Sequence, residues 1–249
     1  MRRAGSVFAC LTAALLAAPM AHADLIGLYA VADGWRYDGT ADIAQTGTTP
    51  EHFELGNKTV PSLAVAFEHP APLVPNVRLQ YTRLKGNDRL NTLAFRFDDK
   101  LYVGQVDFAL DATTTDLIAY YELLDNVVSV DAGVGAKLID GDLTASGNLA
   151  TTTSTVSVRQ AIPVLYASAT VKLPLTGLSV TASGNGLSYN GSSISDVSGA
   201  VQYKVVDVPM FDLNLRAGYR QVQLKLRDVE DLDAEATFKG PFLGVQAHF

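Results

Sequence analysis

The amino-acid sequence predicts an all-β protein, a transmembrane antiparallel up-and-down β-barrel of about ten strands, with eight or twelve strands as alternatives. Three features support this prediction. Apolar residues recur at every second position through most of the chain after residue 23, which is the period of a strand with two different faces. Short turns alternate with longer polar stretches, and residues 238–249 form an amphipathic strand at the end of the chain.

The first 23 residues have the layout of a secretory signal peptide. Arg2 and Arg3 form a positive start, an apolar run covers residues 7–18, and Ala21 and Ala23 occupy the positions that a signal peptidase inspects. The apolar run is shorter than the roughly 20 residues of a membrane-spanning helix. We therefore expect cleavage before Asp24, so that residues 1–23 are removed and residues 24–249 form one barrel domain.

Composition restricts the function of the exported chain. The 26 acidic residues outnumber the 19 lysines and arginines, which argues against nucleic acid as a partner. The single cysteine, Cys10, lies in the predicted signal peptide. The mature chain then has no disulfide and is stabilised by burial or by lipid.

Ten segments with the strand period follow one another. The orientation of the first is ambiguous, whereas the later ones have one apolar face and one small face of mixed charge, as a narrow lumen requires. A soluble sandwich would instead have bulkier apolar faces turned inward. The predicted strands are residues 24–37, 60–68, 77–82, 116–123, 128–138, 165–173, 178–183, 196–205, 211–220 and 238–249.

The connections between these segments predict the topology. Four are short, namely residues 69–76, 124–126, 174–177 and 207–210, and five are long and polar, namely residues 38–58, 86–115, 141–159, 190–195 and 225–237. Short turns on the periplasmic side and long loops outside are typical of outer-membrane barrels, so both termini are expected in the periplasm. Residues 90–110 alternate loosely; we expect an extra hairpin above the membrane, with a twelve-stranded wall as the alternative.

Lipid requires that the barrel be closed. An unpaired backbone amide in hydrocarbon costs several kcal/mol, so the first strand is expected to pair with the last. Aromatic residues near the strand ends fit the two interfacial girdles of such barrels. They are Phe67, Tyr203, Phe211 and Phe249 on the turn side, and Tyr81 and Tyr219 nearer the loops.

The start of the mature chain, Asp24-Leu-Ile-Gly-Leu-Tyr29 followed by Trp35, and the terminal Phe249 resemble a family of small outer-membrane β-barrel proteins of Gram-negative bacteria, most of unassigned function. The resemblance implies location in the cell outer membrane, among lipid and lipopolysaccharide. It also implies that Phe249 is an assembly signal read by the barrel-assembly machinery, with periplasmic chaperones as further partners during biogenesis. It transfers no catalytic residue, metal or cofactor, and we expect a monomer.

Charged residues on the predicted inward faces are the main candidates for a site. Opposite charges could pair across so narrow a lumen and plug it. The alternative is a narrow passive channel for ions or small solutes, but selective pores are usually lined by charges of one sign, so the mixture favours the plug. The expected lumen-facing charges are Glu68, Arg78, Glu122, Asp131, Lys137, Lys172, Lys204, Asp212 and Arg216.

Basic residues are also expected outside the barrel. Arg83, Lys85 and Arg89 follow the upper girdle and are candidates for contacts with lipopolysaccharide phosphates, although a solvated surface would show the same run. The acidic stretch 228–235 departs from the spacing of a calcium loop, so no metal site is predicted.

Catalysis is not expected. Of the histidines after the signal peptide, only His52 falls on the loop side of the predicted topology, and a lone loop histidine is usually solvated. An outer-membrane enzyme, either a protease or a lipid A-modifying enzyme, remains an alternative, as does a soluble periplasmic binding barrel. We predict a non-catalytic protein without cofactor that has a structural or interaction role at the cell surface.

Overall fold

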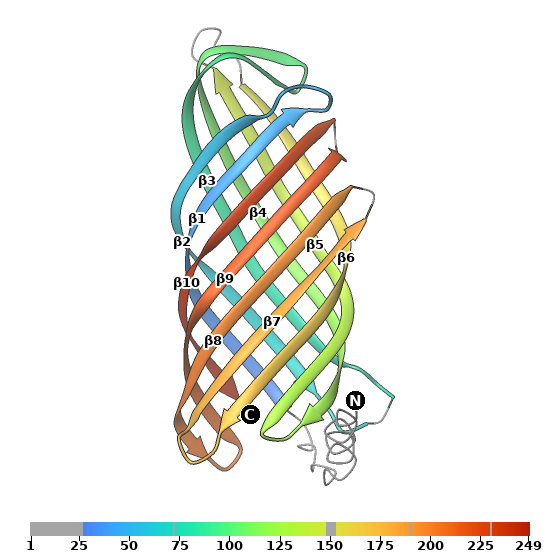
Figure 1. Cartoon of the computed structure of the whole chain (residues 1–249), viewed down its shortest axis with the longest axis vertical. Coiled ribbons are helices and arrows are strands. Elements are labelled where there is room, and N and C mark those ends of the chain that lie inside the picture. The colour runs from blue at the N-terminus through green and yellow to red at the C-terminus, as the bar shows by residue number, and fades with distance from the viewer. Residues whose placement is uncertain (1–26, 72, 148–152, 190, 230) are drawn as a thin grey trace, which may run out of the picture.

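The structure, a computed structural model, describes residues 27–71, 73–147, 153–189, 191–229 and 231–249. The predicted signal peptide lies outside the described residues. Ten strands form a closed barrel in which chain neighbours pair antiparallel (Figure 1). They are β1 (Gly27–Gln45), β2 (Glu51–Glu68), β3 (Asn76–Phe97), β4 (Lys100–Asp125), β5 (Val128–Gly147), β6 (Thr153–Leu173), β7 (Leu178–Tyr189), β8 (Ser192–Val208), β9 (Phe211–Val229) and β10 (Leu232–His248). The predicted fold class and strand number are therefore confirmed.

The first and last strands close the barrel. β1 and β10 are paired from Tyr29 opposite His248 to Gln45 opposite Leu232. At the end of the ladder Leu28 and Phe249 exchange backbone hydrogen bonds of 3.1 and 3.0 Å. Within the described ranges there is no helix long and apolar enough to span a membrane.

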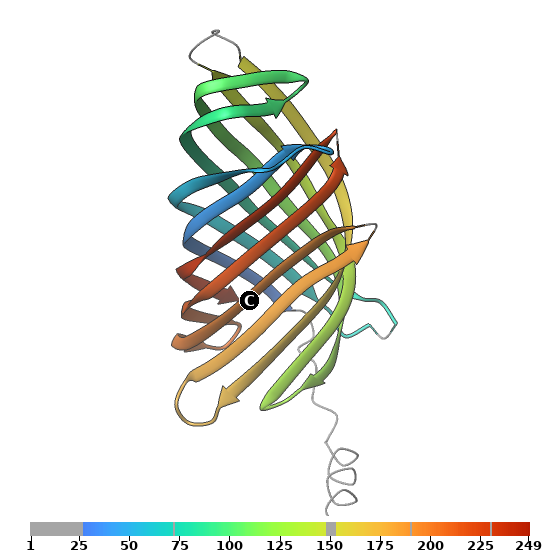
Figure 2. The ribbon, with the colours of Figure 1, turned by 45° about the horizontal axis from the view of Figure 1, so that its top comes forward.

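The strands are longer than predicted, and the loops correspondingly shorter. The stretch 38–58, expected to be a loop, belongs to β1 and β2 except for residues 46–50. Residues 90–110 are not a separate hairpin but the upper ends of β3 and β4, so that prediction was wrong and the count stays at ten. Figure 2 shows the tip of this β3–β4 hairpin bending over the upper end of the barrel.

The exterior of the turn-side half is apolar. We call this half, which includes residues 76–82 of β3, the lower barrel. Every strand contributes an exposed apolar side chain to it, so the apolar surface is a continuous belt, as contact with lipid requires. One from each strand in order is Leu28, Leu63, Leu79, Leu117, Val134, Leu165, Val180, Val201, Leu215 and Leu243.

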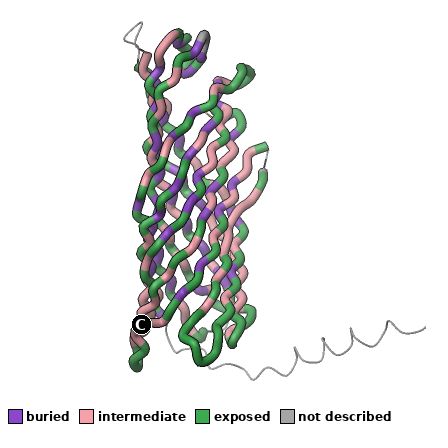
Figure 3. Tube along the Cα trace, turned by 60° about the vertical axis from the view of Figure 1, so that its left-hand side comes forward, coloured by how far each residue is buried: buried purple, intermediate pink, exposed green. Residues whose placement is uncertain are grey.

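The other half, which includes residues 83–97 of β3 and is called the upper barrel, has the opposite arrangement. Its outward positions include Arg83, Arg89 and Asp107, whereas Phe53 and Phe108 point inward and are almost fully buried. Buried and exposed residues alternate along much of the wall, most regularly in β1, β2 and the upper part of β5 (Figure 3). The period of two therefore continues past the lipid, but the apolar face changes from the outer to the inner side, which explains why these segments read as polar loops.

Candidate functional site

A layer of buried charges crosses the lumen near the top of the lower barrel. Lys137 of β5 is fully buried, and its Nζ donates hydrogen bonds to Asp116 of β4 at 2.6 Å and to Asp196 of β8 at 3.1 Å. The guanidinium of Arg220, on β9, donates two bonds to Asp196, of 2.9 and 2.7 Å. We call Asp116, Lys137, Asp196 and Arg220 the charge layer. Its two cations and two carboxylates are mutually paired, which is the condition under which burial of charge is tolerated.

Arg220 connects this layer to the opposite wall of the barrel. Its Nη1 donates to the hydroxyl oxygens of Ser62 on β2 and Thr82 on β3, both at 3.0 Å. Its Cζ lies 4.8 Å from the ring centroid of Trp35 on β1, a cation–π contact. The Trp35 indole in turn donates to the carbonyl of Gly240 at 3.1 Å. One arginine thus contacts side chains of four strands.

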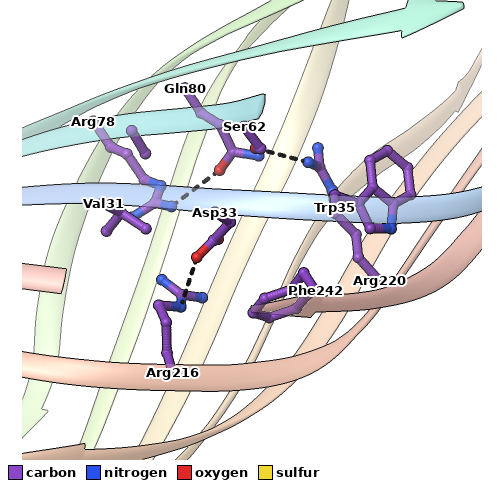
Figure 4. A pocket seen from close by; sticks show the side chains of 10 residues that line it. Val31, Asp33, Trp35, Ser62, Arg78, Gln80, Arg216, Arg220 and Phe242 are labelled. Carbon is purple, nitrogen blue, oxygen red and sulfur yellow. Dashed lines mark hydrogen bonds and ion pairs between the residues drawn. The ribbon is translucent and has the colours of Figure 1, made fainter. Parts of the chain in front are cut away.

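A second charged group adjoins the first from below (Figure 4). Asp33 of β1 lies 3.3 Å from the Nε of Arg216, and both side chains are largely buried. Arg78 donates to Gln80 at 3.0 Å. The cavity that these residues share with Arg220 has a volume of about 20 Å³, little more than the roughly 10–15 Å³ that one water molecule needs.

Most of the remaining predicted lumen charges lie nearer the turn-side mouth. Tyr120 donates to Glu68 at 2.6 Å, and Asn76 donates to Glu122 at 3.2 Å. Lys204 donates to Asp212 at 2.9 Å. Asp131 is opposite Glu122 in the β4–β5 ladder. The side chain of Lys172, 3.5 Å from Asp125, is 60% exposed at the rim.

Sequence reasoning missed three of the four members of the charge layer. Lys137 was predicted, whereas Asp116, Asp196 and Arg220 were not. The signal was present, because alternate residues share a face: Asp116 has the parity of Glu122, and Arg220 that of Arg216. The alternation shows which face of a strand a residue occupies. It does not show at which level of the lumen the side chain lies or which residue of another strand it contacts, and these two properties define the charge layer.

Above the charge layer the lumen is filled by apolar side chains. The rings of Phe53 and Phe108 lie 4.3 Å apart, and Phe95 lies 5.6 Å from Phe53. Tyr37 packs edge-on against Phe238 at 5.2 Å. All five rings are at most 2% exposed. The lumen thus changes from polar to apolar at the level at which the exterior changes from apolar to polar.

The predicted basic surface residues face outward on the upper barrel. Arg83 makes a bidentate pair with Asp111 at 2.7 and 3.0 Å, and Lys85 lies 3.5 Å from the same carboxylate. Arg89 pairs in the same way with Asp107. Hydrogen bonds from the arginines lower the pKa of both carboxyl groups. The positive charges are therefore balanced locally, and a contact with phosphate would compete with these pairs.

His52 also lies on the outer face of the upper barrel. Its Nδ1 is 2.8 Å from Asp42 and its Nε2 is 3.4 Å from Glu54, with the imidazole side chain 54% exposed. The hydrogen bond to Asp42 raises the pKa of His52 above its ordinary value. The arrangement can hold a proton, but the two carboxylates are on the outside of the wall, on the face opposite to the lumen charges.

Comparison with known proteins was informative only at the level of structure. No protein-family model and no curated protein matches the chain. The outer-membrane protease OmpT from Escherichia coli superposes with a TM-score of 0.61, over 94% of this chain and 99% of that one, at 11% sequence identity. The chain has the outer-membrane β-barrel fold.

Two further proteins are also similar, with lower scores. Ail, the attachment invasion locus protein of Yersinia pestis, has a TM-score of 0.38 at 12% identity, over 90% of this chain and 99% of Ail. Neisserial surface protein A has a TM-score of 0.35 at 15% identity, over 88% of this chain and 95% of that protein. At these identities the likeness concerns the fold alone.

The charge layer generates a prediction about stability. Asp196→Asn keeps the shape of the side chain but leaves Lys137 and Arg220 without their shared carboxylate. Because removal of one partner leaves buried charge uncompensated, we expect the free energy of unfolding to fall by about 3–5 kcal/mol. Urea unfolding of the refolded barrel in detergent micelles measures this. Asp140→Asn, which removes an exposed pair with Arg159 at 3.5 Å, is the matched control and should unfold at the wild-type midpoint.

The His52 pair generates a prediction about pH. We expect the His52 ring to titrate above the ordinary value of 6.5, and Asp42→Asn to lower its pKa. Since the folded-state pKa is the higher one, the pair stabilises the fold below pH 6.5 and this contribution is lost as pH rises through the folded-state pKa. The exposure of the ring keeps the effect on stability small. Ring chemical shifts followed against pH measure the pKa; equal values in the two proteins would contradict the assignment.

Proposed function

We propose that this protein is an integral barrel of the Gram-negative outer membrane with a structural or interaction role at the cell surface, a closed lumen and no catalytic activity. The observation that carries the proposal is the filling of the lumen. A paired charge layer occupies the membrane level with a neighbouring cavity of about 20 Å³, and buried aromatic rings lie above it. We infer that the described residues at these two levels leave no continuous path for a hydrated ion.

The outer surfaces of the lower and upper barrel support the proposed location in the outer membrane. Lipid contact accounts for the apolar belt of the lower barrel, to which all ten strands contribute. The belt runs around the whole circumference, which favours a monomer surrounded by lipid. The charged upper barrel then stands above the hydrocarbon, where Arg83, Lys85 and Arg89 lie just beyond the belt and are the proposed contacts for lipopolysaccharide phosphates.

The carboxyl-terminal residue supports the proposed route of assembly. Phe249 is 52% exposed, and its ring lies 5.2 Å from that of Phe211 at the turn-side end of the barrel. An aromatic side chain at this end fits the interfacial girdle. We propose that the chain is exported through a cleaved signal peptide, is then bound by periplasmic chaperones, and is recognised at Phe249 by the barrel-assembly machinery.

Conductance separates the closed barrel from the narrow passive channel. Protein that has been refolded, and shown to be folded by its altered gel mobility without boiling, is expected to give no current steps in a planar bilayer at either polarity, because both lumen levels are filled. A porin inserted in the same bilayer serves as the positive control. Reproducible unitary steps across independent preparations would favour the channel instead.

A surface protease is the second candidate function. Two observations favour it: OmpT, which shares the fold with a TM-score of 0.61, is an outer-membrane protease, and His52 is 2.8 Å from Asp42. Against it, the pair lies on the outer wall, and the second nitrogen of the ring lies 3.4 Å from another carboxylate, that of Glu54, and not from a nucleophile.

The protease candidate can be tested on the purified barrel. We expect no cleavage of unfolded protein substrates, because the ring of His52 is partnered, among the described residues, by the outward carboxylates of Asp42 and Glu54 and not by a nucleophile. If cleavage does occur, His52→Ala decides whether the pair is responsible: loss of activity would support the protease, and unchanged activity would show that it comes from elsewhere or from a contaminant. Thr59→Ala, at an exposed position on the same strand, controls for a general effect of surface substitution.

A further inference from the structure

An apolar cavity lies inside the upper barrel. Its volume is about 70 Å³, and nine of the ten strands line it, so it lies near the barrel axis. Nineteen described residues form its wall, and Thr114 is the one among them with a polar side chain. The larger side chains around it include Ile43, Leu55, Phe108, Leu143, Val222 and Phe238.

The charge layer forms the floor of this cavity. Each of its four members is two residues from a lining residue on the same strand, and therefore on the same inward face. The four neighbouring pairs are Asp116 and Thr114, Lys137 and Ile139, Asp196 and Ile194, and Arg220 and Val222. The cavity is thus separated from the turn-side mouth by paired charges.

Aromatic rings lie on the opposite side. Phe108 lines the cavity and also packs against Phe53 at 4.3 Å and against Phe97 at 6.3 Å. These rings are at most 2% exposed. The space is therefore bounded below by charge and above by close-packed rings.

Small residues leave this space open. Ala41 of β1 and Ala236 of β10 face each other in the closing ladder, and both line the cavity. Ala112, Gly141 and Ala234 add further short side chains to the wall. Since interiors are normally packed with few voids, a single larger residue at one of these positions would remove the cavity.

We propose that the cavity is a binding site for a small, uncharged, apolar molecule. An apolar cavity does not retain water, and one of about 150 Å³ takes up benzene or xenon. A polar or charged ligand would lose its hydrogen bonds to water without replacement. With about 70 Å³ available, the ligand has only a few heavy atoms, so an acyl chain is too large.

Xenon is the probe that tests this proposal. The refolded full-length mature barrel, labelled at the isoleucine δ1 methyl groups, is placed in lipid nanodiscs and titrated with xenon. Ile43, Ile139 and Ile194 line the cavity. Ile118 is buried in the same lumen but lies two residues beyond Asp116, below the charge layer, and serves as the internal control. We expect saturable shifts of the three lining methyl groups and none of Ile118.

Two variants complete the experiment. Ala41→Leu fills the cavity and is expected to weaken xenon binding at least tenfold, whereas Ala161→Leu adds the same side chain on the exposed face of β6 and should bind as wild type. Ala236→Leu replaces Ala41→Leu if the latter does not fold, as judged by gel mobility without boiling. The proposal is overturned if shifts rise without saturation for all methyl groups, as partition into lipid would produce, or if they stay saturable in the filled variant.

Discussion

The hydrogen-bonding requirement of the backbone in hydrocarbon determines the architecture of this molecule. No water is available there, so each strand needs a partner on both sides. The ladder from Tyr29 to Gln45 against β10 meets this requirement for the strands at the two ends of the chain. Closure in turn produces a lumen, and the lumen must be filled or hydrated.

The two halves fill the lumen by different means, and the surroundings of each half explain why. In the lower barrel the apolar side chains point to lipid, so the inward positions carry polar groups such as Lys137 and Asp196, which are compatible with burial only as pairs. In the upper barrel the exterior is in water, and the hydrophobic effect favours apolar residues inside. Arg220 lies at the boundary, with carboxylate, hydroxyl and aromatic partners at once.

The sequence therefore predicts the lower barrel better than the upper one. The alternation at Leu63, Val65 and Phe67 is apolar enough to identify a lipid-facing strand, and all three are exposed as expected. Residues 38–58 have the same period, but charged residues on the outer face, such as Asp42 and Glu54, make the stretch look like a loop. The ion pair of Lys137 with Asp196 joins β5 to β8 across the lumen, and no local pattern specifies a contact between strands that are not neighbours.

Interruptions of the hydrogen-bond ladder mark the same boundary. The β2–β3 ladder ends at Ser62 opposite Thr82, directly above the exposed Tyr81. Beyond it, side chains take over the backbone groups: the Tyr37 hydroxyl both donates to the Lys85 carbonyl and accepts from its N–H, each at 2.7 Å.

Beyond the end of the β2–β3 ladder, a carboxylate also accepts hydrogen bonds from backbone N–H groups. Asp88 accepts hydrogen bonds from the backbone N–H groups of Glu54 and Arg89 at 2.9 and 2.7 Å. The β6–β7 ladder likewise ends at the exposed Leu165, opposite Gly186. Strands separate only where water and polar side chains can satisfy their edges, so the upper barrel can vary in height and shape while the lower barrel cannot.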